Sequence, residues 1–403
     1  MIKKLTCILV FWLSAFYAFS QSGFSIEEAI RYLASPELEG RKIQTKGDTL
    51  TIQYLVNQFE TMIVKPFFNQ YEQPFCGKSI MLTHKNELCS RNVVALVEGT
   101  DKKLKEQYIL VCAHFDHLGK VKDVYFPGAN DNASGTAAVL YLANYFAKNP
   151  AKRSLIFACF AGEELGFLGS SNFIKAIPEL LPKIKCVVNF DMVGRYARGG
   201  VSITGKESSK LLEKIVHKIS EKEKININPS HALFFGGSDH YVFYLKNIPF
   251  LCFNTGEDKK NYHTPRDCSD SIDYKGIETV ANMARQIIEE LDVNSKEPDF
   301  KKIDQKKLIV DNSEIMQLLF SGGLNKFGFI FNLLEECGNE FEIKKTTATG
   351  VEAGLLPGDK VIKINGKEFQ CSNDFLDLIR TEKEKPYKIT IIRNGEIMEV
   401  VVE

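Results

Sequence analysis

Histidines and acidic residues recur in five short segments across the middle of the chain. Their donor atoms are imidazole nitrogens and carboxylate oxygens, which suit zinc, with manganese or cobalt as alternatives. No Cys-x-x-Cys pair occurs, so a cysteine-ligated zinc site is not expected. One such segment alone is more often structural than functional, but five in succession predict a metal centre. The segments are His114-Phe115-Asp116-His117, residues 128–135 around Asp131, Gly162-Glu163-Glu164-Leu165-Gly166, Asp191, and Tyr262-His263-Thr264-Pro265.

A pair of metal ions would turn this donor set into a hydrolytic site. Two divalent ions in such centres lie about 3.5–4 Å apart and need about three protein ligands each, and a bridging carboxylate allows that approach. Two divalent cations, three carboxylates and one hydroxide carry no net charge, so a further carboxylate beside them can stay ionised. Such a carboxylate can take a proton from the attacking water. The adjacent Glu163 and Glu164 offer one ligand and one general base.

The elements that position these segments are buried strands separated by helices. Continuous apolar strands between helices predict an α/β fold, with a mixed, mostly parallel sheet flanked by helices. Ligands of such sheets lie beyond the carboxyl ends of the strands. The five segments follow or adjoin those ends, so we expect them to converge on one crevice. The strands are predicted at residues 108–112, 154–160, 186–190 and 249–253, and the clearest helices at residues 134–148 and 274–291.

The order of these motifs resembles the co-catalytic zinc aminopeptidases, a family that also includes glutamate-carboxypeptidase-like and glutaminyl-cyclase-like members. The resemblance covers about residues 25–293, and Leu38-Glu39-Gly40-Arg41 resembles the family's N-terminal segment. It implies a fold of the zinc exopeptidase type and a peptidase domain over residues 21–295. The matching motifs are His-x-Asp, Asn-Asp-Asn-x-Ser-Gly, Gly-Glu-Glu-x-Gly, Asp-Met-Val-Gly and Tyr-His-Thr-Pro.

The resemblance implies five metal ligands and two zinc ions. Each ion would have two ligands of its own, and one carboxylate would bridge the pair. His114 and Asp191 would hold the first ion. Glu164 and His263 would hold the second, and Asp131 would bridge both.

Two further residues would assist the reaction by the same resemblance. Glu163 would act as general base when water attacks the first peptide carbonyl. Asp116 would orient His114, because metal-bound imidazoles usually need such a partner. The family often has a cis peptide bond after the bridging residue, which here is the bond Asp131-Asn132.

Neighbouring side chains could contact the substrate. His240 and Tyr241 lie in a segment that resembles one near the family's substrate pocket, where Tyr241 either donates to the developing oxyanion or simply packs. Arg195 either contacts the substrate or pairs with a structural carboxylate. His117 is interpreted as an imidazole that supports the ligands or lies on the surface, because the ligand positions are already filled.

A second unit follows a charged linker over residues 296–325. Short strand-like stretches and glycine turns predict a small, mostly β domain over residues 326–403. Residues 350–366 resemble a PDZ domain, and Phe327, Gly328 and Phe329 resemble its peptide-binding loop. Such a domain captures the terminal carboxylate of an extended peptide. The alternative is a module that only packs on the peptidase.

Residues 1–20 have the layout of a secretory signal peptide. Lys3 and Lys4 precede an apolar stretch, and Ala18-Phe19-Ser20 is a small-residue cleavage pattern. The apolar stretch is shorter than the roughly 20 residues of a spanning helix, and an uncleaved anchor is the alternative. We expect a periplasmic or secreted protein with no membrane span after cleavage. In that compartment Cys76 and Cys89 are the first pair to test for a disulfide.

Charge and motifs together favour one function over its alternatives. The 51 basic and 51 acidic residues leave no formal net charge, which argues against nucleic-acid binding. We predict an exported metallo-aminopeptidase that acts on peptides with a free N-terminus. The alternatives are a glutaminyl-cyclase-like transferase with one zinc ion, a carboxypeptidase that grips its substrate through Arg195 and Arg198, and a PDZ peptide-binding protein with an inactive site. Ligands for two ions, together with Glu163, favour the aminopeptidase.

Overall fold

The computed structural model describes most of the predicted peptidase domain and parts of the C-terminal region. Residues 1–20, residues 304–325 of the predicted linker, Phe327 and Gly328 lie outside the described residues. The described residues are 24–77, 87–121, 123–228, 237–256, 260–294, 296–303, 329–330, 341–343, 345–346, 348–368, 378 and 385–402.

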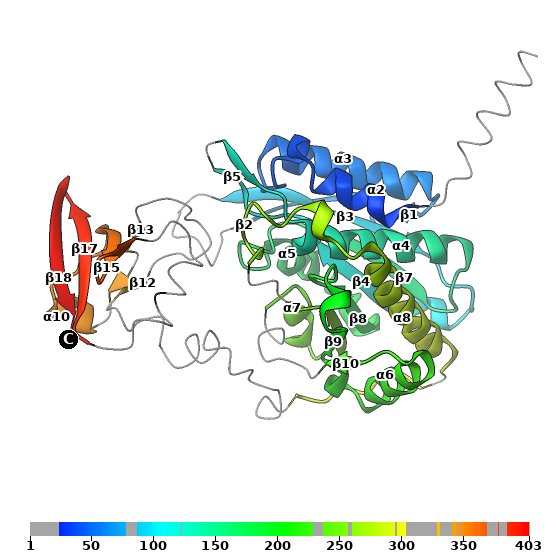
Figure 1. Cartoon of the computed structure of the whole chain (residues 1–403). Coiled ribbons are helices and arrows are strands. Elements are labelled where there is room, and N and C mark those ends of the chain that lie inside the picture. The colour runs from blue at the N-terminus through cyan, green and yellow to red at the C-terminus, as the bar shows by residue number, and fades with distance from the viewer. Residues whose placement is uncertain are drawn as a thin grey trace, which may run out of the picture.

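One large mixed sheet forms the centre of the peptidase region (Figure 1). Among the described residues its strands are β1 (Lys65–Pro66), β2 (Glu72–Gly77), β3 (Leu88–Val97), β4 (Tyr108–His114), β7 (Ser154–Phe160), β8 (Ile184–Phe190), β9 (Val201–Thr204), β10 (Ile227–Asn228) and β11 (Phe250–Asn254). Their order is β1-β3-β7-β4-β8-β11-β9-β10, and β2 pairs with β3. The middle strands β7, β4, β8 and β11 are parallel, whereas β3 and β9 pair with their inner neighbours antiparallel. The prediction of a mixed sheet with a parallel centre is confirmed.

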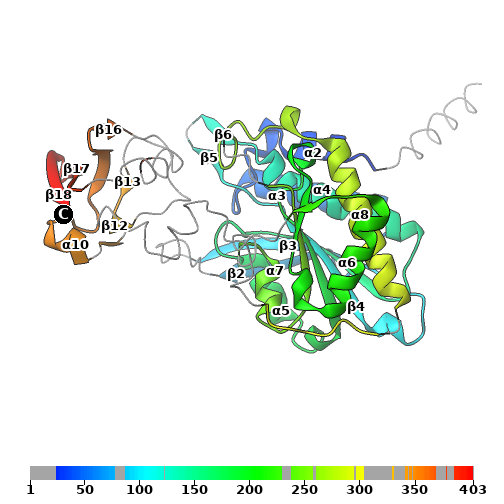
Figure 2. The ribbon, with the colours of Figure 1, turned by 60° about the horizontal axis from the view of Figure 1, so that its bottom comes forward.

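Alternate residues of the central strands enter two separate apolar cores, one on each face of the sheet. In β4, Ile109 and Val111 belong to the larger core, while Leu110 and Cys112 belong to the smaller one. The larger core is covered by α2 (Ile26–Leu33), α3 (Lys46–Thr61), α4 (Ser134–Lys148), α6 (Lys210–Glu223) and α8 (Tyr274–Val293). On the other face lie α5 (Leu168–Ala176) and α7 (His240–Tyr244), which contribute Phe173 and Phe243 (Figures 1 and 2).

Polar side chains cap the N-terminal ends of α2, α3 and α8. The Ser25 Oγ accepts a hydrogen bond from the Glu28 N–H at 3.2 Å, and Thr45 caps α3 in the same way. Asp273 caps α8 by accepting from the Gly276 N–H at 2.9 Å. Each cap satisfies an N–H group that has no partner within the helix.

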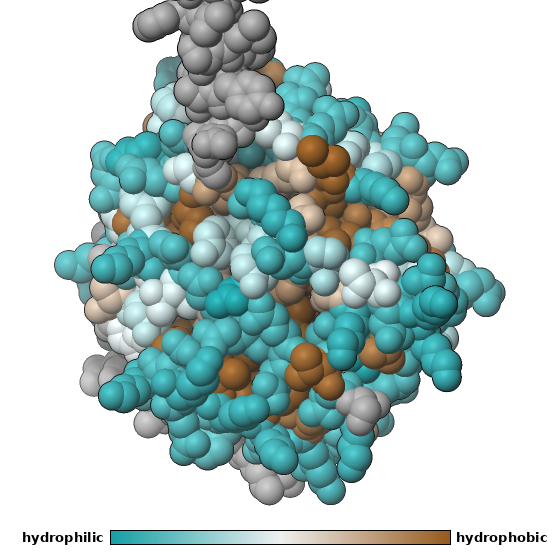
Figure 3. Space-filling model, turned by 90° about the vertical axis from the view of Figure 1, so that its right-hand side faces the viewer, coloured by the Kyte–Doolittle hydropathy of each residue, from teal (hydrophilic) through white to brown (hydrophobic). Residues whose placement is uncertain are grey.

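Hydrophilic side chains cover most of the outer surface seen from the right-hand side of Figure 1, with hydrophobic ones interspersed (Figure 3). Most apolar residues of α6 and α8 point instead into the large core. Within the described residues, no helix combines the length and the apolar character that crossing a membrane would require.

Cys76 and Cys89 form a disulfide between directly opposed positions of β2 and β3. The antiparallel register brings their Cα atoms to 4.1 Å. Four further cysteines are free and buried in the apolar cores, namely Cys112, Cys159, Cys186 and Cys252. A β-hairpin of β5 (Gly119–Val121) and β6 (Val124–Phe126) precedes the loop that contains Asp131.

The C-terminal region contains a small β module with its own core. Its strands are β12 (Phe329–Ile330), β13 (Phe341–Glu342), β14 (Lys345–Thr346), β15 (Lys360–Ile364), β16 (Lys367–Glu368), β17 (Tyr387–Arg393) and β18 (Glu396–Val402), with the helix α10 (Ala348–Glu352). Asn394 and Gly395 have positive φ and join β17 to β18 in a two-residue turn, as their sequence predicts. The predicted β domain exists; its PDZ identity stays a prediction, as does the role of Phe329, which lies in β12.

Candidate metal centre

The segment around Asp131 is held against the end of β8 by three polar side chains. The Asn130 Oδ1 accepts a hydrogen bond from the Gly194 N–H at 2.8 Å. The Asn132 Oδ1 accepts from the Met192 N–H at 3.2 Å, and the Ser134 Oγ accepts from the Val193 N–H at 3.0 Å. The Asp131-Asn132 peptide bond is cis, as the resemblance implied. The Asn-Asp-Asn-x-Ser motif therefore fixes Asp131 relative to the strand end that carries Asp191.

Two groups of potential metal donors meet at this segment. One group contains His114, Asp131 and Asp191, and the other contains His117, Asp131, Glu164 and His263. In each group the donor atoms lie within 4.8 Å of one another. Asp131 belongs to both groups. All five predicted ligands are thus brought together, from segments that span 150 positions of the chain.

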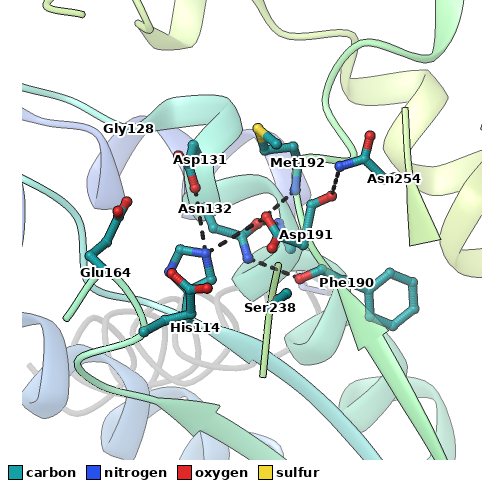
Figure 4. Close-up of polar contacts among 12 residues, drawn as sticks. His114, Gly128, Asp131, Asn132, Glu164, Phe190, Asp191, Met192, Ser238 and Asn254 are labelled. Carbon is teal, nitrogen blue, oxygen red and sulfur yellow. Dashed lines mark hydrogen bonds and ion pairs between the residues drawn. The ribbon is translucent and has the colours of Figure 1, made fainter. Parts of the chain in front are cut away.

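The first group centres on the imidazole at the end of β4. The His114 Nε2 lies 3.4 Å from the Asp131 Oδ1 and 3.7 Å from the Asp191 Oδ1 (Figure 4). Its Nδ1 lies 3.1 Å from the main-chain oxygen of Asp116 and 3.8 Å from the Asp116 carboxylate. The predicted partner Asp116 therefore orients His114 mainly through its carbonyl group. Its carboxylate instead accepts the Glu163 N–H at 3.1 Å.

The second group uses the other oxygen of Asp131. The His263 Nε2 lies 3.0 Å from the Asp131 Oδ2 and 3.4 Å from the Glu164 Oε1. The His117 Nδ1 lies 2.9 Å from the same Glu164 oxygen. His117 is buried, so the expectation that it could lie on the surface is wrong. Each carboxylate oxygen of Asp131 thus faces a different donor group.

Carboxylates dominate the electrostatics of the two imidazoles that face Asp131. Burial alone would lower the pKa of His263, but Glu164 and Asp131 raise it to about 10. Burial is likewise outweighed at His114, whose pKa is raised well above its ordinary value by the surrounding carboxylates. Burial would raise the pKa of both Asp131 and Glu164, but the imidazoles hold it well below its ordinary value at Asp131 and at about 2 at Glu164. The site is therefore built for positive charge, as divalent cations require.

Two acids beside the ligands, Glu163 and Asp116, have a raised pKa, in contrast to Asp131 and Glu164. Burial raises the pKa of the Glu163 carboxyl well above its ordinary value; the positive charge of His114 opposes the shift and the negative charge of Glu164 adds to it. Burial also raises the pKa of Asp116 to about 7. Burial therefore opposes ionisation of both carboxyl groups, whereas nearby positive charge favours it.

Arg41 is a supporting residue whose contacts could not be foreseen. Its fully buried guanidinium donates to four main-chain carbonyl groups, at distances of 2.5–2.9 Å. These carbonyls belong to Leu33, Phe115, Pro127 and Gly128. Arg41 thereby ties α2 to the loops that carry His117 and Asp131. The only sequence signal was its place in the Leu-Glu-Gly-Arg segment.

Asp267 is a second supporting residue that the sequence analysis missed. Its carboxylate accepts the N–H groups of Asn130 and Asp131, each at 3.0 Å. Arg195 pairs with the same carboxylate at 3.0 Å, and both side chains are 2% exposed. Arg195 also donates to the main-chain oxygen of Ser271. Of the two roles considered for Arg195, the structure favours pairing with a structural carboxylate over contact with the substrate.

The side chain of His240 is buried, and its predicted substrate contact stays a prediction. His240 is fully buried at the start of α7, where its ring stacks on Phe250 with centroids 4.4 Å apart. Its Nδ1 lies 3.5 Å from the Asn189 Nδ2. Tyr241 is partly buried and packs against the smaller core, with its ring 6.3 Å from that of Tyr244. A substrate role for Tyr241 stays a prediction.

Comparison with known proteins gives a consistent family for this region. Residues 92–288 match Peptidase family M28. Aminopeptidase YwaD of Bacillus subtilis is 26% identical over 301 residues, which cover 70% of this chain and 59% of that protein. A probable zinc metalloprotease of Pyrenophora teres f. teres is 36% identical over 105 residues, which cover 25% of this chain and 22% of that protein. The chain therefore spans less than two thirds of the length of these relatives.

Solved structures share the fold at low sequence identity. LapA aminopeptidase of Legionella pneumophila has a TM-score of 0.54 and 22% identity, over 68% of this chain and 72% of that one. A glutaminyl cyclase of an Acidobacteriales bacterium has a TM-score of 0.54 and 18% identity, over 66% of this chain and 94% of that one. The same fold thus occurs in an aminopeptidase and in a cyclase, so the fold alone does not separate these functions.

Proposed function

Because residues 92–288 match peptidase family M28, we propose that the protein is a zinc-dependent aminopeptidase that removes N-terminal residues from peptides. The observation that carries this proposal is the position of Asp131. One of its carboxylate oxygens faces His114 at 3.4 Å, and the other faces His263 at 3.0 Å. This arrangement supports a dinuclear centre in which one carboxylate serves two metal positions.

Each metal position would have a defined set of protein donors. His114, Asp131 and Asp191 would hold the first zinc ion, and Asp131, Glu164 and His263 would hold the second. Bound zinc ions would polarise the scissile carbonyl and lower the pKa of water. The donors are nitrogen and oxygen atoms in a buried crevice, which fits zinc and leaves manganese and cobalt possible.

Glu163 is the best-placed general base in this proposal. It is adjacent to a ligand, and its N–H group is fixed by the Asp116 carboxylate at 3.1 Å. Burial raises its pKa, and bound cations would favour its ionised form, which is the form that accepts a proton. Glu163 would take a proton from the attacking water and then deliver it to the departing amine. A peptide with a free N-terminus is thereby shortened by one residue.

We further propose that the protein is exported after removal of residues 1–20 and that its β module is a PDZ-like unit for peptide C-termini. The disulfide between Cys76 and Cys89 supports export, because such bonds persist in oxidising compartments. The sequence of residues 350–366 supports the PDZ-like assignment. A C-terminal peptide would then be a ligand distinct from the substrate.

A panel of aminoacyl anilides, assayed with and without a chelator, tests the proposed activity. We expect hydrolysis that the chelator removes and zinc restores. Glu163→Gln should keep its zinc and lose about 10²–10⁴-fold in turnover. The exposed Glu179→Gln is the matched control and should keep its activity. Chelator-resistant hydrolysis would contradict a metal mechanism, and cyclisation of N-terminal glutamine without hydrolysis would establish the cyclase instead.

A further inference from the structure

We infer that His117 is an additional zinc ligand at the second metal position, which would then hold four protein donors. This inference rests on the proposed metal centre and goes beyond its five ligands. The relevant atom is the His117 Nδ1, which belongs to the same donor group as Asp131, Glu164 and His263.

The ring of His117 is held in place by the backbone around it. Its side chain is 0% exposed. A Cβ atom at Gly128 would lie 2.6 Å from both the Cγ and the Cδ2 of this ring, so glycine at that position provides the space for it. Gly128 precedes the segment of Asp131 and stands beside it in the site (Figure 4). The position of the imidazole is therefore built into the same loop as the bridging carboxylate.

The distances within this group match a shared cation. Donors about 2.0–2.1 Å from a tetrahedral zinc ion lie about 3.3–3.4 Å from one another. The His117 Nδ1 lies 2.9 Å from the Glu164 Oε1 and 3.8 Å from the Asp131 Oδ2. The His263 Nε2 lies 3.4 Å and 3.0 Å from the same two oxygens. The four distances between these two nitrogens and two oxygens thus range around the value of about 3.3–3.4 Å expected for a tetrahedral zinc ion.

A hydrogen bond to Glu164 alone satisfies this imidazole poorly. The Nδ1 can carry one hydrogen, whereas two carboxylate oxygens lie within 3.8 Å of it. The Nε2 is buried and has no hydrogen-bond partner in the described part of the chain. Burying a polar ring with so few contacts is unfavourable unless a stronger interaction compensates. A bond from Nδ1 to a zinc ion would supply that interaction at Nδ1, while the Nε2–H would stay without a partner among the described residues.

The consequence is an asymmetric metal centre. The second position would have four protein donors, whereas His114, Asp131 and Asp191 give the first position three. Structural zinc sites are closed by four protein donors, and catalytic sites keep one position open. The second position would therefore bind zinc more tightly, and the first would keep the open position for water or substrate.

X-ray absorption at the zinc edge of the full-length, zinc-loaded wild-type protein tests this inference directly. Three imidazoles shared by two zinc ions would support it, because His114, His117 and His263 would all be ligands. Two imidazoles for two ions in a protein that hydrolyses peptides would overturn the inference and leave the proposed function intact. Three imidazoles in a protein without peptidase activity would support the inference and overturn the proposed function. A wild-type protein that binds no zinc would overturn both.

Substitution of His117 separates a ligand from a residue that only donates to Glu164. His117→Cys keeps a zinc donor, whereas His117→Gln keeps a hydrogen-bond donor and is a poor zinc ligand. We expect chelator competition to show that His117→Gln loses more than about 100-fold in affinity for the tighter zinc ion, beyond the loss of an orienting partner, while His117→Cys retains it. The exposed His217→Ala is the control and should bind two ions normally. Wild-type affinity in His117→Gln and loss in His117→Cys would overturn the inference.

Discussion

At the residue scale, the candidate metal centre is a buried cluster of carboxylates and imidazoles for which protons and cations would compete. The pKa of His263 is raised from 6.5 to about 10, so its contacts with Glu164 and Asp131 stabilise the metal-free fold fully below about pH 6.5. That stabilisation is lost as the pH rises through about 10. Zinc binds only the neutral imidazole, so protons and zinc compete for this ring.

We therefore predict that zinc binding at pH 7 releases protons. At least two should leave each molecule, one from His263, whose pKa is raised to about 10, and one from His114, whose pKa is raised well above its ordinary value. Calorimetric titration of metal-free protein in buffers of different ionisation enthalpy measures this number. The apparent zinc affinity should also rise between pH 6 and pH 9. A heat of binding that does not depend on the buffer would contradict the account.

The sequence identified some residues of the site but not the orientation of others. His114, Asp131, Glu164, Asp191 and His263 were identified because their motifs occur in a recognisable order after strands. The sequence could not show where a side chain points. His117 and His240 both neighbour such motifs, yet one ring faces the donors and the other is buried against Phe250.

At the element scale, the site depends on loops that buried charges hold in place. Asp267 fixes the N–H groups of Asn130 and Asp131 and is itself paired with Arg195. Arg41 fixes the carbonyl groups of the loops on the other side of Asp131. Both residues position ligands and belong to neither donor group.

Asp267→Asn should weaken zinc binding without removing a ligand. The amide has one acceptor oxygen in place of two, and the substitution removes the carboxylate that lies 3.0 Å from the buried guanidinium of Arg195. We expect a loss of about 10–100-fold in zinc affinity, measured by chelator competition. Asp270→Asn is the control, because its 83% exposed side chain makes only a surface ion pair with Arg31. Unchanged affinity in Asp267→Asn would show that this loop is held by other contacts.

Arg41→Met should destabilise the fold. It removes the donors of four buried hydrogen bonds, and each unsatisfied carbonyl costs about 1–3 kcal/mol. We expect the free energy of unfolding, measured in urea, to fall by about 3 kcal/mol or more. Arg91→Met is the control, because its 37% exposed side chain pairs with Glu72 near the surface and contributes less than about 1 kcal/mol. Equal stabilities of the two variants would contradict the role of Arg41.

Strands were predicted correctly where both faces of the sheet are buried, because such strands have continuous apolar sequences. The predicted strands at 108–112 and 154–160 correspond to β4 and β7. The longest strand, β3, was missed because Arg91 and Asn92 interrupt its first half. The Asn92 side chain is nevertheless buried, since its Nδ2 donates to the Gly169 carbonyl at 2.9 Å and its Oδ1 accepts from the Ala161 N–H. Such tertiary partners cannot be foreseen from local pattern.

At the scale of the whole molecule, a large mixed sheet that carries the Cys76–Cys89 disulfide is followed along the chain by a β module with its own core. The motifs predicted the family whose model matches residues 92–288, because strand ends and ligand order determine the site. The β module is confirmed as a domain with its own core of residues such as Val361 and Ile389. Its ligand depends on a groove whose predicted loop lies mostly outside the described residues.

We predict that protein recovered from the exported fraction begins at Gln21 and contains the Cys76–Cys89 disulfide. Intact-mass measurement before and after reduction checks both points. Cys76→Ser should lower the free energy of unfolding by about 3 kcal/mol, because the bond closes a short loop of the unfolded chain. Cys268→Ser changes a free cysteine outside the apolar cores and is the control. A full-length mass with reduced cysteines would contradict export.

The claim on which everything else depends is that Asp131 lies between two metal ions. Anomalous diffraction at the zinc edge, from crystals of the zinc-loaded protein, measures this most directly. We predict two peaks, one beside His114 and Asp191 and the other beside Glu164 and His263, with the Asp131 carboxylate between them. A single peak, or two peaks that do not share Asp131, would contradict the dinuclear centre.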